Sequence, residues 1–347
     1  MNQNLIVNRQ ILLASRPVGA PTPSNFNFTE TVIPKPQQGE VLLRTVYLSL
    51  DPYMRGRMSD AESYAEPVAI GEAMVGGCVC RVEQSLNSDF EQGDWVVAFA
   101  GWQDYSLSDG SQLIKLSPEM ANPSYALGIL GMPGLTAYMG LLDIGQPKAG
   151  DTVVVAAATG AVGSLVGQIA KLTGCKVIGI AGGTDKCLYA CETLGFDACI
   201  DHYQDDFAQQ LAASCEQGID VYFENVGGKV FDAVMPLLNP AARVPVCGLI
   251  SQYNATHLPE GPDRLSALMA LLLIKRIKMQ GFIVFDDYGH RYGEFFSAMQ
   301  QWLAQGRLIY KEDKVEGLAN AVPAFIGLLQ GENFGKLVVR VGPDHLA

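Results

Sequence analysis

Two glycines in the segment VVVAAATGAVGSLVG stand between an apolar run and a helical pattern. The G-x-G-x-x-G spacing of dinucleotide-binding loops is kept, except that Ala158 occupies the first glycine position. Glycine at 160 would let the main chain approach a pyrophosphate, and glycine at 163 would let the helix pack on a sheet. The helix N-terminus would bind the anion through its free N–H groups. We interpret Ala158, Gly160, Ala161, Val162 and Gly163 as a cofactor-binding loop, with a tight turn of packing glycines as the alternative.

The next apolar segment, VIGIAGGTDK, ends in small residues where an NAD-binding chain usually carries an acid. An Asp or Glu there would bind the ribose 2′-hydroxyl and would repel a 2′-phosphate. Ala181, Gly182 and Gly183 leave room for that phosphate, and Lys186 follows shortly after them. The pattern favours NADP, with Gly182 and Lys186 as cofactor-binding residues. A solvated surface lysine is the alternative for Lys186.

The segments around these loops alternate between strand and helix patterns from residue 123 to 297. Apolar runs such as DTVVVAAA, CKVIGIA and GIDVYFENVGG alternate with helical patterns such as AVGSLVGQIAKLTG. This alternation predicts an α/β fold with a doubly wound parallel sheet. ARVPVCGLIS and MQGFIVF are expected to be later strands, although Pro245 is awkward inside a strand. The apolar run from Ala267 to Ile274 is expected to form a buried helix.

The two ends of the chain have a different pattern. Residues 1–122 contain short apolar runs punctuated by Gly, Pro and Asp, which predicts a β-rich, barrel-like domain. The tail, 298–347, combines helical patterns with the strand KLVVRV and is expected to rejoin that domain. We therefore expect a first domain over 1–122, a cofactor domain over 123–297 and a returning segment over 298–347.

Composition and charge exclude several classes of partner. The chain has 347 residues, a net charge of −12 and no run rich in Lys and Arg, so neither nucleic acid nor an anionic membrane is expected to bind. No segment reaches the ~18 apolar residues of a membrane span. The N-terminus lacks the pattern of a secretory signal. Eight scattered cysteines without a C-x-x-C pair favour a reduced, cytoplasmic location.

Five separated motifs resemble the medium-chain dehydrogenase/reductase superfamily: LDPYMRGRM, GMPGLTAY, AAATGAVG, FENVGG and GENFGK. They are similar to its zinc-free branch of prostaglandin reductases, leukotriene hydroxydehydrogenases and plant 2-alkenal reductases. SYAEPVAIGEAMVGG, IDHYQDDFA and GLISQYNAT resemble the bacterial NADPH-dependent curcumin reductases. The resemblance implies a GroES-like first domain, a Rossmann domain, an active site in the cleft between them, and a homodimer joined through the Rossmann domains.

The resemblance also implies roles for individual residues. It places Thr136 near the nicotinamide, Lys186 at the 2′-phosphate and Tyr253 at the active site. Further cofactor contacts are expected from Asn225, Cys247, Gly248, Ser251, Phe282 and Asn333. Tyr53, Tyr64 and Phe285 are expected to face the substrate, with core packing as the alternative for both phenylalanines and for Tyr64. His202 stands where many relatives carry a cofactor-holding tyrosine, so that either His202 or Tyr203 is expected to supply this contact; a histidine satisfied at a strand end is the alternative.

The positions that hold zinc in other members of the superfamily carry no metal ligands here. SLDPY and IGEAM stand at those positions, and Cys78 and Cys80 are the only cysteines in residues 1–120, so we expect no metal. Without a Lewis acid, hydride transfer needs a substrate whose own carbonyl group makes the acceptor carbon electrophilic, such as an enone or enal. Hydride addition to the β-carbon leaves an enolate, which Tyr253 is expected to stabilise.

These expectations combine into an NADPH-dependent reductase of the C=C bond of α,β-unsaturated ketones and aldehydes, including curcumin-like compounds. An NADPH quinone reductase is one alternative. A non-catalytic NADPH-binding or structural protein is the other.

Overall fold

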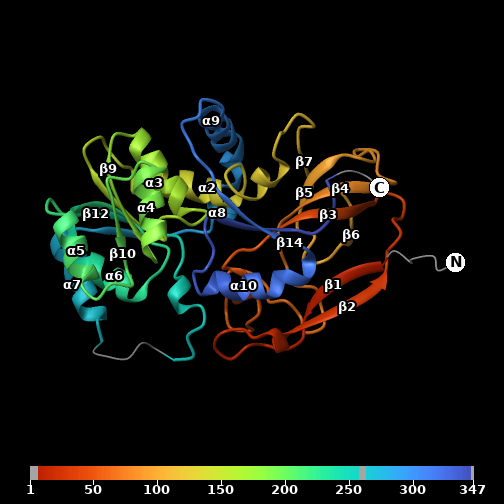
Figure 1. Cartoon of the computed structure of the whole chain (residues 1–347), viewed down its shortest axis with the longest axis horizontal. Coiled ribbons are helices and arrows are strands. Elements are labelled where there is room, and N and C mark those ends of the chain that lie inside the picture. Colours follow the sequence, from red (N-terminus) through yellow and green to blue (C-terminus); the bar gives the residue numbers. More distant parts are fainter. Residues whose placement is uncertain (1–6, 258–262, 345–347) are drawn as a thin grey trace. The chain divides into compact units, whose positions relative to one another are not determined.

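The computed structural model describes residues 7–257 and 263–344, which form two compact units (Figure 1). The first unit contains the described residues up to Leu127, Glu312–Asn333 and the residues from Leu337 onward. The second unit contains Gly128–Lys311 and Phe334–Lys336. The tail expected over 298–347 is thus divided, because residues 298–311 belong to the second unit.

The second unit is built on a six-stranded sheet in the order β10-β9-β8-β11-β12-β13, and all of its neighbouring strands are parallel. The strands are β8 (Thr152–Ala156), β9 (Lys176–Ala181), β10 (Ala198–Asp201), β11 (Ile219–Phe223), β12 (Leu238–Val246) and β13 (Lys278–Gly281). The order reverses between β8 and β11, and ligands of such sheets bind beyond the carboxyl ends of the strands at this point. The predicted doubly wound sheet is confirmed.

Helices connect these strands. They are α2 (Met132–Met139), α3 (Gly163–Leu172), α4 (Thr184–Glu192), α5 (Phe207–Ser214), α6 (Gly228–Val234), α7 (Leu265–Lys275), α8 (Val284–Tyr288) and α9 (Tyr292–Ala304). Apolar residues at helical spacing explain their packing: Leu211 of α5 and Val230 and Val234 of α6 join one buried cluster with the sheet. Gly174, at φ 85°, provides the left-handed residue that follows the end of α3.

Two local expectations for this unit are wrong. MQGFIVF does not remain a strand to its end, because β13 stops at Gly281 and α8 begins at Val284. The carboxylate of Asp287 accepts the Ile283 N–H at 2.9 Å, and acids in the first turn favour a helix start. The run from Ala267 to Ile274 forms α7, but none of its residues is buried. This helix is apolar on all sides, and the sheet covers only part of it.

The strand predicted for ARVPVCGLIS is confirmed in spite of its proline. Pro245 lies within β12 and pairs with Gln280 of β13. Its carbonyl accepts the Glu224 N–H at 3.0 Å, so that the missing N–H of proline does not prevent pairing on that side.

The first unit is β-rich, as expected. Its larger sheet has the order β14-β15-β3-β4-β5-β7, with β6 also paired to β3, and β1 and β2 form a separate antiparallel pair. The elements are β1 (Val7–Leu13), β2 (Phe26–Val32), β3 (Val41–Ser49), β4 (Cys78–Ser85), β5 (Trp95–Ala98), β6 (Tyr105–Ser108), β7 (Ile114–Lys115), β14 (Glu312–Glu316), β15 (Lys336–Arg340), α1 (Met54–Arg57) and α10 (Ala321–Leu329). In the core, Trp102 stacks on Phe26 at 5.8 Å and meets the edge of Phe325 at 5.6 Å.

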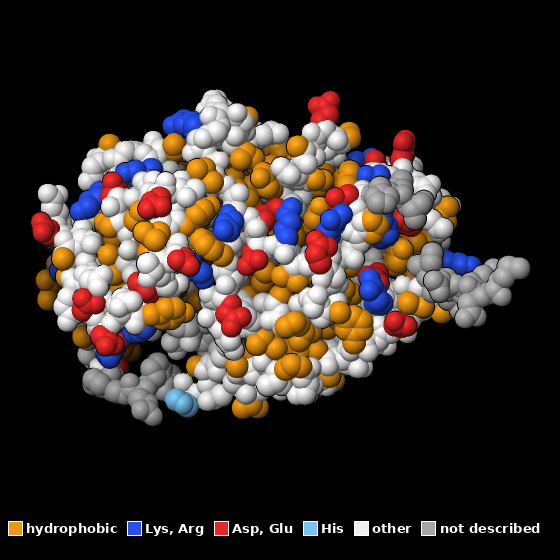
Figure 2. All heavy atoms as spheres, in the orientation of Figure 1, with side chains coloured by type: hydrophobic (Ala, Val, Ile, Leu, Met, Phe, Trp, Pro, Cys, Tyr) orange, Lys and Arg blue, Asp and Glu red, His pale blue; other side chains and the backbone are white. Residues whose placement is uncertain are grey.

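The surface has mixed charges. On the face drawn in Figure 2, Lys and Arg side chains lie scattered among Asp, Glu and neutral side chains. None of the helices in the described ranges combines the length and apolar character needed to cross a bilayer.

Candidate cofactor and active site

The glycine loop lies where the sheet order reverses, between β8 and α3. A Cβ at Gly163 would lie 2.2 Å from the Ala157 carbonyl oxygen, so only glycine fits there. The Gly160 N–H donates to the same carbonyl at 2.9 Å, and the Ala158 N–H donates to Ile180 at 3.0 Å. Gly160 also forms a parallel bridge with Gly335. The loop is therefore tied to its neighbours by main-chain bonds, with α3 beginning at its end.

The other loop residues have distinct surroundings. Ala158 is buried, and its methyl would lie 2.8 Å from a Cβ at Gly179, which shows tight packing against β9. Ala161 and Val162 are half-buried and precede α3, whose N-terminus has no side-chain cap. The N–H groups of Ser164 and Leu165 donate to the carbonyls of Gly160 and Val162, at 3.1 and 3.0 Å. The positive end of the α3 dipole, with no side-chain cap, is still suited to an anion.

The turn after β9 is held by a carboxylate that sequence reasoning missed. Asp201, the last residue of β10, accepts N–H groups from Gly183 at 2.9 Å and Tyr203 at 3.0 Å. Burial opposes its ionisation, but these hydrogen bonds hold the pKa of Asp201 below its usual value. Gly182 is needed for close packing, because a Cβ there would lie 2.8 Å from the Tyr203 ring. Asp201 thus shapes the turn that precedes α4 and Lys186.

His202 directly follows Asp201, and the charges of two lysines act on its ring. Its Nδ1 is buried and has no hydrogen-bond partner within the part of the chain that the structure describes. Burial, followed by the charges of Lys229 and Lys186 among other causes, lowers the pKa of His202. The ring is therefore largely neutral near pH 7, and Tyr203 contacts it edge-on at 4.5 Å between ring centres.

Asn225 and a second missed carboxylate lie at the carboxyl end of β11. The Asn225 side-chain amide donates to the Ala156 carbonyl of β8 at 2.8 Å and so bridges the switch point. Glu224 Oε1 accepts the N–H groups of Val226 at 2.6 Å and Gly227 at 2.9 Å. Burial is the main reason why the pKa of Glu224 is raised. The roles of Asp201 and Glu224 could not be predicted from sequence, because each binds main-chain N–H groups that folding brings close to it.

The segment after β12 packs on this turn. Cys247 and Gly248 donate their N–H groups to the Glu224 carbonyl, at 2.9 and 3.2 Å. Burial raises the pKa of the Cys247 thiol to about 12, which keeps it protonated. Ser251 Oγ donates to the Val226 carbonyl at 2.5 Å. Tyr253 is half-buried, and its hydroxyl accepts the Leu249 N–H at 3.3 Å.

Three other predicted residues of the second unit lie on α2 or near α8. Thr136 is buried on α2 and donates its hydroxyl to the Met132 carbonyl at 2.8 Å. Phe282 is buried, and its ring would lie 2.8 Å from a Cβ at Gly140, which shows core packing on this side. Phe285 is exposed. Phe282 thus packs against the end of α2 within its own unit, and the predicted cofactor and substrate roles of both phenylalanines stay predictions.

Three predicted residues belong to the first unit. Tyr53 precedes α1 and is half-buried, and burial is the main cause that raises the pKa of its phenol. Tyr64 is largely exposed. Asn333 is the last residue of the segment Glu312–Asn333.

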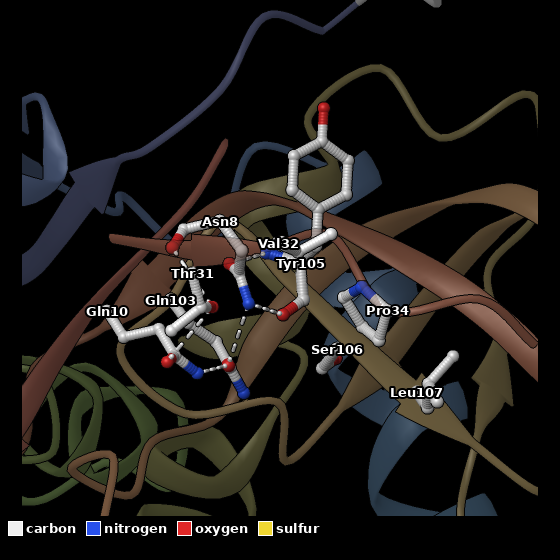
Figure 3. Close-up of a pocket in the computed structure, with 9 residues that line it drawn as sticks. All are labelled: Asn8, Gln10, Thr31, Val32, Pro34, Gln103, Tyr105, Ser106 and Leu107. Atoms are coloured by element: carbon white, nitrogen blue, oxygen red, sulfur yellow. Dashed lines mark hydrogen bonds between the residues drawn. The ribbon is translucent and has the colours of Figure 1, made fainter. Parts of the chain in front are cut away.

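A surface pocket of about 330 Å³ lies in the first unit, beside β1, β2 and β6 (Figure 3). Its amide side chains bond to each other or to main chain: Gln10 donates to Gln103 at 2.6 Å, and Asn8 donates to the Tyr105 carbonyl at 3.0 Å. None of the predicted cofactor or substrate residues lines it.

The residues of the second unit fit an NADP-type dinucleotide better than a metal. A Cβ at Gly183 would meet nothing within 4 Å, and α4 begins there without a side-chain cap. His202, whose buried Nδ1 has no partner among the described residues, donates its main-chain N–H to the Ala181 carbonyl at 3.0 Å. Two lysines influence that histidine. Among residues 7–257 and 263–344, no group of three or more His, Cys, Asp or Glu side chains could hold a metal ion.

Comparison with known proteins agrees with this arrangement. Residues 9–116 match a family described as the N-terminal domain of oxidoreductase, and residues 161–304 match one described as zinc-binding dehydrogenase. The chain is 62% identical over 344 residues to the NADPH-dependent curcumin reductase of Escherichia coli, covering 99% of this chain and 100% of that protein. It is 41% identical to the NADP⁺-dependent 2-alkenal reductase of Nicotiana tabacum, over 98% of this chain and 99% of that protein.

A solved structure is similar in both sequence and fold. CurA from Vibrio vulnificus in complex with NADPH superposes with a TM-score of 0.95 at 71% identity, covering 96% of this chain and 99% of that chain. Similarity of this extent covers the glycine loop, both units and the intervening motifs. The chain therefore belongs to the medium-chain dehydrogenase/reductase family, in the branch that contains the curcumin, 2-alkenal and prostaglandin reductases.

Proposed function

We propose that the chain is an NADPH-dependent reductase of the C=C bond of α,β-unsaturated ketones and aldehydes. The observation that carries this proposal is a glycine loop at the sheet's switch point, followed by a second strand, β9, that ends without an acid. The helix after β9 starts without a side-chain cap, and the charges of two lysines act on His202 beside that turn. The near full-length similarity to curcumin and 2-alkenal reductases supports the choice of substrate class.

The chain's own residues have two tasks in this reaction. When bound, NADPH would supply a hydride to the β-carbon, and a proton taken from solvent would complete the reduction at the α-carbon. As the hydride arrives, the C=C electron pair moves toward the carbonyl oxygen, which becomes an enolate oxygen. Tyr253 donates a hydrogen bond to that oxygen and stabilises the negative charge. The loop from Ala158 to Gly163, Asn225 and Lys186 bind and orient the cofactor.

A substrate panel tests this function. NADPH oxidation is followed with an enone, an enal, a quinone and a saturated ketone, and the products are identified by mass spectrometry. We expect turnover of the enone and enal to saturated carbonyl products, and no reduction of the saturated ketone. Faster turnover of the quinone would favour a quinone reductase, and NADPH binding without turnover of any compound would favour a non-catalytic protein.

The same panel tests whether a metal is needed. Since the zinc positions of the superfamily carry no ligand set here, exhaustive chelation is expected to leave the rates unchanged. Loss of activity on chelation that zinc restores would contradict this part of the proposal.

We also propose that two copies associate through the second unit. β13 is an edge strand of the sheet, and the exposed apolar residues of α7 lie in the connection between β12 and β13. Leu273 and Ile274 are 79% and 72% exposed. Contiguous exposed apolar side chains next to an open sheet edge are typical of an interface. A second copy of the chain would cover them.

Light scattering tests this association. Leu273→Lys is expected to shift the wild-type dimer toward monomer, because it places a charge in the covered surface. Val18→Lys changes an apolar residue of the first unit that is 90% exposed, and it is expected to leave the dimer intact. A monomeric wild-type chain, or a dimer that Leu273→Lys does not weaken, would refute the proposed interface.

A further inference from the structure

A lysine outside the predicted site lies beside its phosphate-facing end. Lys229 is the second residue of α6, which follows β11, whereas Lys186 lies on α4, which follows β9. The Lys229 ammonium donates to the His202 carbonyl at 2.6 Å. Through this bond, a residue of α6 reaches the turn that follows β10, where the Tyr203 ring lies against Gly182.

This contact leaves the Lys229 charge available to an anion. An ammonium has three N–H donors, and the bond to His202 uses one of them. Lys229 is exposed, and no carboxylate among the described residues forms an ion pair with it. The nearest acid of the turn, Asp201, directs its oxygens to the N–H groups of Gly183 and Tyr203 and to the Gln204 amide.

The charges that act on His202 indicate that both lysines lie near this turn. His202 experiences the charges of Lys229 and Lys186, and both disfavour its protonated form. The two ammonium groups therefore act on one small region although they come from different helices. Two like charges that act on one region are stabilised when an anion binds between or beside them.

We propose that Lys229 is a specificity-determining residue, which acts with Lys186 to favour a dinucleotide that carries a 2′-phosphate over one that does not. The inference rests on the proposed function, since it assumes that the dinucleotide binds at this switch point. Lys229 acts by charge and by fixing the 202–203 turn through the His202 carbonyl. Only the charge distinguishes NADPH from NADH, because a correctly held turn serves both cofactors.

Binding measurements with Lys229→Met test this inference. Methionine keeps the length of the apolar stem but removes the charge and the donors. Dissociation constants are measured for NADPH and NADH by fluorescence titration, and for adenosine 2′,5′-bisphosphate and AMP by calorimetry. We expect roughly threefold to tenfold weaker binding of the two 2′-phosphate compounds and less than about a twofold change for the others. Lys229→Arg should restore most of the difference, and added salt should reduce it.

Lys176 provides a matched control. It is exposed, belongs to the same sheet and donates to the Ser214 carbonyl at 2.8 Å, but it stands at the opposite, amino end of β9. Lys176→Met is expected to leave all four constants unchanged. Equal losses for NADPH and NADH in Lys229→Met would show a structural role only, and unchanged NADPH binding would refute the inference. A wild-type chain that does not prefer NADPH would instead contradict the proposed function.

Discussion

Tyr253→Phe is expected to lower kcat for an enone by about 100-fold while NADPH binding stays nearly unchanged. The phenol follows β12 and the helical turn Ile250–Gln252, and its oxygen lies 3.0 Å from the position of a Cβ at Gly248. The oxygen accepts the Leu249 N–H through one of its lone pairs. An accepted hydrogen bond strengthens the phenol as a donor. Removing the hydroxyl therefore removes a donor that is needed chiefly in the transition state.

Pre-steady-state kinetics give the decisive measurement, because they isolate the hydride-transfer step from product release. If a ribose hydroxyl of the cofactor shares the role, the loss falls to roughly tenfold. Tyr105→Phe is the control, since Tyr105 is also half-buried but lies on β6 of the first unit. An unchanged hydride-transfer rate in Tyr253→Phe would exclude Tyr253 as an oxyanion donor.

The parts of the site that sequence predicts are those built by local geometry. The loop from Ala158 to Gly163 is fixed by the short path from strand to helix, and at Gly163 any side chain would collide with the Ala157 carbonyl. The small residues after β9 likewise follow from local requirements, because the Tyr203 ring lies against Gly182. Such steric requirements restrict the residue types at fixed positions of the chain. The fold class and the cofactor loop could therefore be predicted from the sequence.

The parts that sequence could not predict depend on contacts between distant segments. Asp201 and Glu224 accept hydrogen bonds from main-chain N–H groups. Every residue except proline has such a group, so the residue types around Asp201 and Glu224 do not indicate that these carboxylates hold turns. Lys229 reaches His202 across 27 positions of sequence. The helix α7 shows a second limit of sequence reasoning. Its apolar residues predict that its surface is covered, but they do not indicate whether the chain itself or a second molecule covers it.

Lys186→Ala is expected to weaken NADPH binding by about tenfold to over a hundredfold and to change NADH binding little. Lys186 is half-buried in the first turns of α4, three residues after Gly183, where the helix begins without a side-chain cap. An ammonium at this place adds a charge-assisted hydrogen bond to the 2′-phosphate, and partial burial makes it stronger than a fully exposed pair. The effect should exceed that of the exposed Lys229.

Titration of both cofactors against wild type, Lys186→Ala and Lys176→Ala decides between a phosphate contact and a general loss of structure. If Lys186 contacts the phosphate, added salt should reduce the wild-type preference for NADPH over NADH and should have less effect on this preference in Lys186→Ala.

The double variant Lys186→Ala/Lys229→Met tests whether both lysines bind the same phosphate, because two ammonium groups that bind one phosphate compensate for each other. Their losses should then not add, whereas lysines acting at separate places would give additive losses. Equal weakening of NADPH and NADH by Lys186→Ala would show that this lysine does not recognise the phosphate.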